Sequence, residues 1–132
     1  METLDKQVRQ ARRALQSLGR ALGERPTDIV RDSTIKRFEY SFDIIWKTLK
    51  RHLFTSEGLA AASPKSVFRE ALRVGLLSER EAEHAIRMTD DRNKTAHTYD
   101  AGDAQEVYRH IRKYYPLLTD LLGRITAKQK AK

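Results

Sequence analysis

Apolar residues recur along this chain at the spacing of an α-helix, and that spacing limits the fold more than any other feature. Near the N-terminus they step alternately by four and three residues, which places them on one helical face. The members of this stripe are Leu4, Val8, Ala11, Leu15, Leu18 and Leu22. No segment of the sequence shows the period-two alternation of a strand flanked by hairpin turns. The sequence therefore predicts an all-α fold.

The next two helices are predicted from the same spacing and from residues that suit helix starts. We expect the second helix between about Ser33 and Phe54, with Asp32 or Ser33 as its cap. A connection follows, and Ser63 with Pro64 provides a capping hydroxyl and a first helical residue for a short third helix.

The fourth and last helices flank the most unusual part of the chain. Ser78 and Glu81 form a capping box that opens the fourth helix. We expect Asp103 or Glu106 to cap the last helix, and Pro116 to kink it because proline lacks an N–H and crowds the preceding turn. The fold class predicted is an up-down four-helix bundle with an additional short helix.

Length and composition predict one domain and restrict its location. A chain of 132 residues suits a single helical bundle domain at residues 1–126, followed by a basic C-terminal tail at 127–132. There is no cysteine, no apolar run long enough to span a membrane and no apolar leader, so we expect a cytoplasmic protein without a membrane partner. Long apolar stripes on the first and last helices favour a homodimer.

Positive charge is concentrated toward the C-terminus. The formal net charge is +8, and residues 109–132 contain seven Lys or Arg and one Asp, a balance of +6. Arg109, Arg112 and Lys113 lie together on the predicted last helix, where they could follow a nucleic-acid backbone or contact an acidic partner. An ordinary solvated helix face explains the same pattern equally well.

The stretch "DRNKTAHTYD", from Asp91 to Asp100, contains residues that a helical bundle does not need. Arg92 continues the inward stripe of the fourth helix, so its guanidinium requires an anion or several acceptors. His97 follows five residues later, about 140° further round a continuous helix. The two side chains can converge only if the helix ends between them, and the poor helix formers of this stretch favour such an end.

A guanidinium beside an imidazole suits the cleavage of RNA without a metal. Arg92 could hold the scissile phosphate, and His97 could remove the proton from a ribose 2′-hydroxyl. The sequence contains no cluster of carboxylates that would suggest a metal site, and we expect no cofactor. The alternative is structural: Arg92 pairs with an acid and caps the helix end, while His97 and Tyr99 pack the turn.

This stretch, together with "RDSTIKRFEYSFDIIWKTLKRHL" at residues 31–53, resembles the nucleotidyltransferase substrate-binding proteins, relatives of the HepT toxins in the HEPN group. The resemblance implies a helical, usually dimeric partner of a minimal nucleotidyltransferase (MNT). It implies that Arg92 and His97 are the pair credited with RNA cleavage, and that Tyr99 receives AMP. Asp91 and Asn93 match neighbouring motif positions and are assigned supporting roles. Further matches on the second helix are Arg37, Phe38, Glu39, Trp46 and Lys47.

Two functions follow from the resemblance, and we expect the first and keep the second as the alternative. The first is a metal-independent RNase toxin that the cognate MNT silences by transferring AMP. The second is a non-catalytic subunit that binds RNA or a nucleotide and works with a separate transferase. The chain lacks the Gly-Ser and paired aspartates of a nucleotidyltransferase, so any transfer must be done by the partner. A third option is a helical dimer whose motif loop is purely structural.

Overall fold

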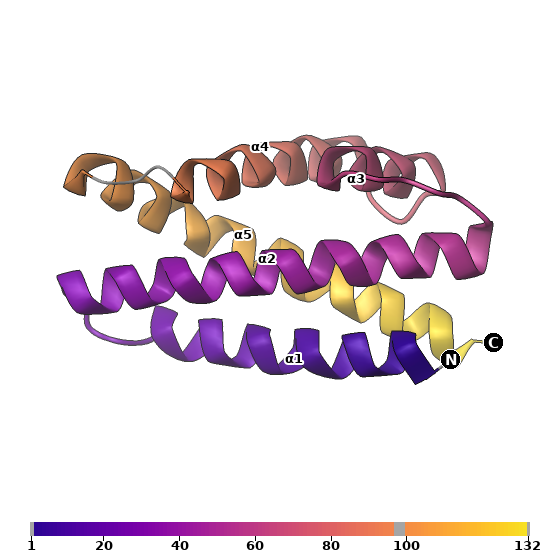
Figure 1. Ribbon diagram of the computed structural model, residues 1–132, viewed down its shortest axis with the longest axis horizontal. Coiled ribbons are helices and arrows are strands. Elements are labelled where there is room, and N and C mark those ends of the chain that lie inside the picture. The colour runs from indigo at the N-terminus through magenta and orange to yellow at the C-terminus, as the bar shows by residue number, and fades with distance from the viewer. Residues whose placement is uncertain (1, 97–99, 132) are drawn as a thin grey trace.

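The computed structural model of the protein describes residues 2–96 and 100–131, which form five α-helices and no strand (Figure 1). The helices are α1 Glu2–Leu22, α2 Asp28–Glu57, α3 Pro64–Arg73, α4 Glu79–Thr95 and α5 Ala101–Lys130. The all-α prediction is confirmed. Two residues of the predicted site, His97 and Tyr99, lie outside the described residues.

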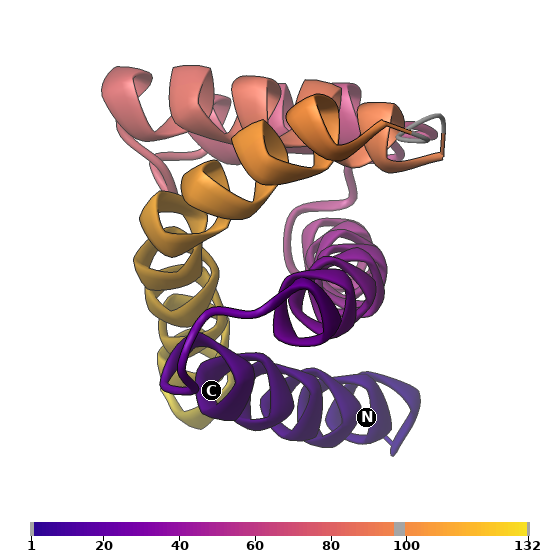
Figure 2. The same ribbon diagram turned by 90° about the vertical axis from the view of Figure 1, so that its left-hand side faces the viewer.

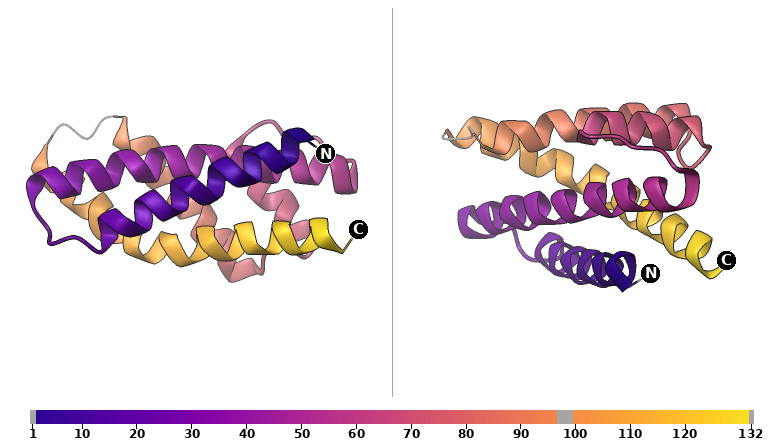
Figure 3. Two further views of the ribbon diagram at one scale, coloured as in Figure 1. Left: turned by 90° about the horizontal axis from the view of Figure 1, so that it is seen from below. Right: turned by 45° about the vertical axis from the view of Figure 1, so that its right-hand side comes forward.

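The four long helices alternate in direction, and the short α3 lies beside α4 (Figure 1). Helix α2 packs against each of the other four helices, while α1 also packs against α5 and α4 against both α3 and α5 (Figure 2). The predicted up-down bundle with an additional short helix is therefore confirmed. Both chain ends lie at one end of the bundle, and the junction between α4 and α5 lies at the other (Figures 1 and 3).

Helix α2 begins about a turn earlier than the sequence predicted. Its N-cap is Thr27, whose hydroxyl accepts a hydrogen bond from Val30 N at 3.1 Å, and the expectation of Asp32 or Ser33 as the cap is wrong. The reason is that the first turn of α2 carries no buried apolar residue, and Ile29 is 82% exposed. An apolar stripe cannot locate a turn that projects beyond the core.

Helix α5 likewise starts before its predicted caps. The Asp100 carboxylate accepts a hydrogen bond from Asp103 N at 2.8 Å, so Asp100 is the cap and the expectation of Asp103 or Glu106 is wrong. The helix remains one element through Pro116 and curves along its length (Figure 2). It continues to Lys130 and includes most of the segment that was expected to be a basic tail.

The predicted starts of α3 and α4 are confirmed. Ser63 caps α3 with Pro64 in its first turn, and the Ser63 hydroxyl accepts from Ser66 N at 3.2 Å. Ser78 and Glu81 form the reciprocal capping box of α4, with bonds of 3.1 Å from Glu81 N to the Ser78 hydroxyl and 2.9 Å from Ser78 N to the Glu81 carboxylate.

One hydrophobic core joins all five helices. Its largest fully buried side chains include Phe38 and Phe42 of α2 and Phe68 of α3, whose rings lie in contact with one another along the α2 face. Trp46 is half-buried and packs against this core. Within the described part of the chain, no helix combines the length and apolar character needed to cross a membrane.

Candidate functional site at the end of α4

The guanidinium of Arg92 is held on the α2 side of α4 by two carboxylates. Asp43 accepts two bonds, at 3.2 Å from Nε and 3.0 Å from Nη2, in a bidentate geometry. Glu39 accepts a third bond from Nη1 at 3.2 Å, and the Thr95 hydroxyl accepts a fourth at 3.1 Å. Glu39 and Asp43 are four residues apart on α2, so both face the same way.

The charge of this cluster does not balance. One guanidinium meets two carboxylates, so with all three groups ionised the Arg92–Glu39–Asp43 cluster carries a charge of −1. The hydrogen bond to Asp43 and the charges of both acids raise the pKa of Arg92, although burial opposes them. The Arg92 side chain remains 23% exposed and Asp43 40% exposed, so solvent or a ligand can reach the cluster.

Arg92 pairs with acids, as the structural alternative expected: among the described residues, its anions are the carboxylates of Asp43 and Glu39. Asp43 lies 49 residues before Arg92 in the chain and was not predicted as its partner. The available signal was the four-residue spacing of Glu39 and Asp43 on the predicted second helix. That spacing alone could not show which later residue faces the pair.

Asp91 faces the opposite side of α4 and bonds to α5. Its carboxylate accepts a hydrogen bond from the Tyr114 hydroxyl and lies 2.8 Å from His110 Nδ1. Asp91 is 5% exposed, and burial together with the bond to Asp91 raises the pKa of Tyr114. Lys94 lies 3.9 Å away as a weaker ionic neighbour. The supporting residue Asp91 therefore fixes the end of α4 against α5.

The position of the helix end agrees with the sequence prediction. Helix α4 ends at Thr95, and Arg92 lies in its last turn, so the expected break between Arg92 and His97 is confirmed. The Asn93 side chain is exposed, and its supporting role remains a prediction. Whether His97 meets Arg92 remains a prediction, because His97 and Tyr99 fall outside the described residues.

The three basic residues predicted as RNA or partner contacts lie on the surface of α5. Arg109, Arg112 and Lys113 are all exposed, and their spacing puts them on one side of the helix. Arg112 also lines a shallow hollow between α1 and α5 with Arg20 and Tyr115. No group of three or more His, Cys, Asp or Glu that could hold a metal ion occurs among residues 2–96 and 100–131.

The fold and the sequence define the class of protein. Residues 6–127 match the family described as "Nucleotidyltransferase substrate binding protein like". This match includes nearly the whole chain, all of α2 and α4, and every residue of the candidate site. The chain therefore belongs to the nucleotidyltransferase substrate-binding protein family.

Two individual proteins are similar to this chain in sequence. A Haemophilus influenzae protein described as a probable ribonuclease HepT is 37% identical over 81 residues, which make up 58% of this chain. The aligned part spans 54%, about half, of that relative's length. A Thermus thermophilus protein of known crystal structure is 44% identical, with a TM-score of 0.83 over 87% of this chain and 98% of that one.

A more distant structural relative has a described partner. The tri-AMPylated HEPN toxin of Shewanella oneidensis, solved in complex with its MNT antitoxin, superimposes with a TM-score of 0.79. The match covers 96% of this chain and 98% of the other, at 12% identity, so the likeness shows a shared fold.

Proposed function

We propose that this protein is the HepT-like partner of a minimal nucleotidyltransferase and cleaves RNA without a metal, using Arg92 and His97. The observation that carries the proposal is the placement of Arg92. Its guanidinium is oriented by Glu39 and Asp43 in the last turn of α4, partly exposed, and His97 follows two residues after that helix ends. The kinship to a probable ribonuclease HepT supports the same assignment.

The chemistry assigns one task to each group. His97 removes the proton of a ribose 2′-hydroxyl, and the resulting oxygen attacks the adjacent phosphorus. The bond from phosphorus to the 5′-oxygen breaks, and that oxygen takes up a proton, leaving a 2′,3′-cyclic phosphate and a 5′-hydroxyl. Arg92 stabilises the charge that grows on the phosphoryl oxygens. Asp43 orients the guanidinium, as a carboxylate commonly does for an arginine that must be placed accurately.

The test is cleavage of single-stranded or transfer RNA in EDTA, followed by analysis of the new ends. Wild-type protein should produce 2′,3′-cyclic phosphate ends, and His97→Ala should produce none. His84→Gln is a matched control, because His84 is a half-buried histidine of α4 that packs against Tyr114. Equal cleavage by wild type and His97→Ala would exclude the proposed chemistry.

The proposed regulation is AMP transfer to Tyr99 by the cognate MNT. The tri-AMPylated form of the Shewanella oneidensis toxin, in complex with an MNT antitoxin, supports this assignment. After co-expression with the MNT, the intact mass should rise by one AMP unit or a multiple of it, and RNA cleavage should stop. Tyr99→Phe should remain active in the presence of the MNT, and unchanged modification of this variant would place the acceptor elsewhere.

A second candidate is favoured by the ion pairs of Arg92. Two carboxylates already engage four of the five guanidinium N–H groups together with Thr95, and their excess charge repels a phosphate. This arrangement suits a non-catalytic subunit that works with a separate transferase. In that case calorimetry would detect the complex with the MNT, and RNA would stay intact with the wild-type protein.

A further inference from the structure

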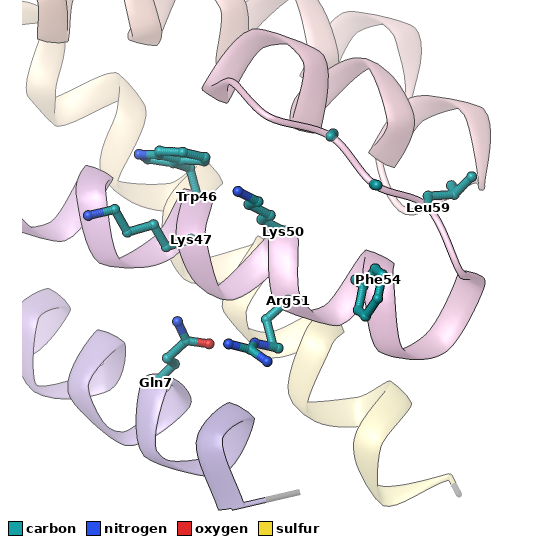
Figure 4. Close-up of a pocket in the computed structure, with 9 residues that line it drawn as sticks. Gln7, Trp46, Lys47, Lys50, Arg51, Phe54 and Leu59 are labelled. Carbon is teal, nitrogen blue, oxygen red and sulfur yellow. The ribbon is translucent and has the colours of Figure 1, made fainter.

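A cavity of about 490 Å³ lies between α1, α2 and the connection from α2 to α3 (Figure 4). Its volume is in the range of small-molecule and cofactor sites. It is lined by Gln7, Trp46, Lys47, Lys50, Arg51, Phe54, Leu59, Ala60 and Ala61. The candidate site at Arg92 does not use any of these residues.

The lining combines aromatic rings with uncompensated positive charge. Trp46 and Phe54 contribute the rings, and Phe54 is 58% exposed, which is unusual for a large apolar side chain. Lys47, Lys50 and Arg51 contribute three cations, and none of them forms an ion pair with a described acid. The lining contains no acidic residue. An anion that carries a flat ring fits this combination.

Two further details favour a ligand with these properties. The Lys50 ammonium lies 6.0 Å from the centre of the Trp46 ring, so positive charge sits beside the aromatic surface. Gln7 Oε1, on the α1 wall, is buried without a hydrogen-bond partner within the described part of the chain. In Figure 4 the side chains of Gln7 and Arg51 point toward each other across the two helices.

The cavity and the candidate site both lie along α2. Asp43, which holds Arg92, is followed one helical turn later by Trp46 and Lys47, and two turns later by Lys50. Seven residues of helix correspond to about 10 Å along the axis. A strand bound at Arg92 could therefore reach the cavity without leaving the surface of α2.

We propose that this cavity binds a nucleotide of single-stranded RNA that flanks the phosphate held at Arg92. A base stacks on Trp46 or Phe54, and the backbone phosphates lie against Lys47 and Lys50, as in other proteins that combine aromatic platforms with basic grooves. The inference rests on the proposed function for its substrate. A second copy of this chain fits less well, because a two-fold contact through this cavity would bring its three cations against the same three.

Trp46 provides the measurement, because it is the only tryptophan of the sequence. We would titrate the full-length protein with a single-stranded 2′-O-methyl oligonucleotide, which lacks the hydroxyl needed for cleavage. Stacking should quench the Trp46 fluorescence. Free AMP serves as the second probe and should quench far less at equal concentration, because it lacks the neighbouring phosphates. Quenching by AMP alone would overturn the assignment to an RNA strand.

Variants separate this cavity from general charge attraction. Lys47→Gln with Lys50→Gln should weaken binding about tenfold and lower the salt slope by about 0.7 for each lysine. Phe54→Ala removes an exposed ring without touching the core and should weaken binding severalfold. The matched control is Arg9→Gln with Arg13→Gln on α1, which removes the same charge from exposed residues that do not line the cavity. An equal loss with both double variants, or no quenching at all, would overturn the proposal.

The two proposals fail in different ways. The 2′-O-methyl probe reports binding alone, so quenching that depends on Lys47 and Lys50 can persist even if no RNA is cut. That outcome would reject the proposed cleavage and keep the binding site. Conversely, RNA cleavage that is unaffected by the α2 double variant, together with an unquenched Trp46, would reject the binding site and keep the nuclease.

Discussion

A bidentate arginine–carboxylate pair lies at each end of α4, and the two pairs differ in what surrounds them. At the start of the helix, Arg124 bonds both oxygens of Glu81, at 2.9 and 2.8 Å, and also the Leu76 carbonyl at 3.0 Å. The Glu81 carboxylate also accepts a hydrogen bond from the backbone N–H of Ser78, the N-cap residue of α4. At the end of the helix, Arg92 bonds both oxygens of Asp43 through Nε and Nη2, and it also bonds Glu39.

This difference separates a structural ion pair from a candidate site. The Arg124–Glu81 pair is neutral, satisfies a helix cap and ties α5 to α4, so stability explains it completely. The Arg92 cluster has one carboxylate more than its charge requires, and it lies beside a helix end that is already fixed by Asp91. The excess carboxylate is the difference that matters here, because exposure does not separate the two arginines: Arg92 is 23% exposed and Arg124 38%.

The largest expected effect concerns the matched substitutions Arg92→Lys and Arg124→Lys. A lysine keeps the charge and loses the bidentate fork. RNA cleavage should fall about a hundredfold in Arg92→Lys and stay unchanged in Arg124→Lys. Cleavage rates measured with a fluorescent RNA substrate would check this. Equal rates in the two variants would show that Arg92 and Arg124 do not differ in function.

The next effect concerns Asp91, whose bonds join α4 to α5. Asp91→Ala leaves the buried hydroxyl of Tyr114 without its acceptor and should lower the free energy of unfolding by about 2 kcal/mol. Urea denaturation measures this loss. Tyr114→Phe is the gentler control and should lose about 1 kcal/mol. A loss below a few tenths of a kcal/mol in Asp91→Ala would show that the bonds of Asp91 to α5 do not stabilise the protein.

A pH titration addresses the Glu81 end of the helix. The Arg124 hydrogen bond and the Ser78 backbone lower the pKa of Glu81 from 4.5 to about 2. A depressed folded-state pKa stabilises the protein above the unfolded value and loses that contribution as the pH falls from about 4.5 toward 2. Because Glu81 is partly exposed and solvent screens its charge, the contribution should be about 1 kcal/mol. In Glu81→Gln, stability measured over this range should lose that part of its pH dependence.

The smallest effect tests the excess carboxylate itself. Glu39→Gln keeps the size and removes one charge, so the Arg92 cluster becomes neutral. Stability should change by less than about 0.5 kcal/mol, while the affinity for a 2′-O-methyl oligonucleotide should rise a few-fold because the repulsion of phosphate is relieved. The fluorescence titration measures this affinity. Weaker binding in Glu39→Gln would mean that Glu39 contributes to the site rather than screening it.

The sequence predicted the parts of this protein that depend on local spacing. Apolar stripes located the helices, and the Ser78–Glu81 box and the Ser63 cap located two of their starts. The cap Thr27 was missed because the first turn of α2 has no buried apolar residue, and Asp100 was missed because Ala104 is the only buried residue in the first turn of α5. The motif identified Arg92, but its partner Asp43 depends on how α2 and α4 pack. That contact joins residues 49 positions apart and has no local signal.

The central claim is that the end of α4 places a guanidinium and an imidazole around one phosphate. A crystal structure of the protein with a nucleoside 2′,3′-cyclic phosphate or a vanadate analogue tests it most directly. The account predicts that the anion lies within hydrogen-bond distance of both the Arg92 guanidinium and the His97 imidazole, with Asp43 still bonded to the other edge of Arg92. An anion bound away from Arg92, with the His97 side chain directed elsewhere in every subunit, would contradict it.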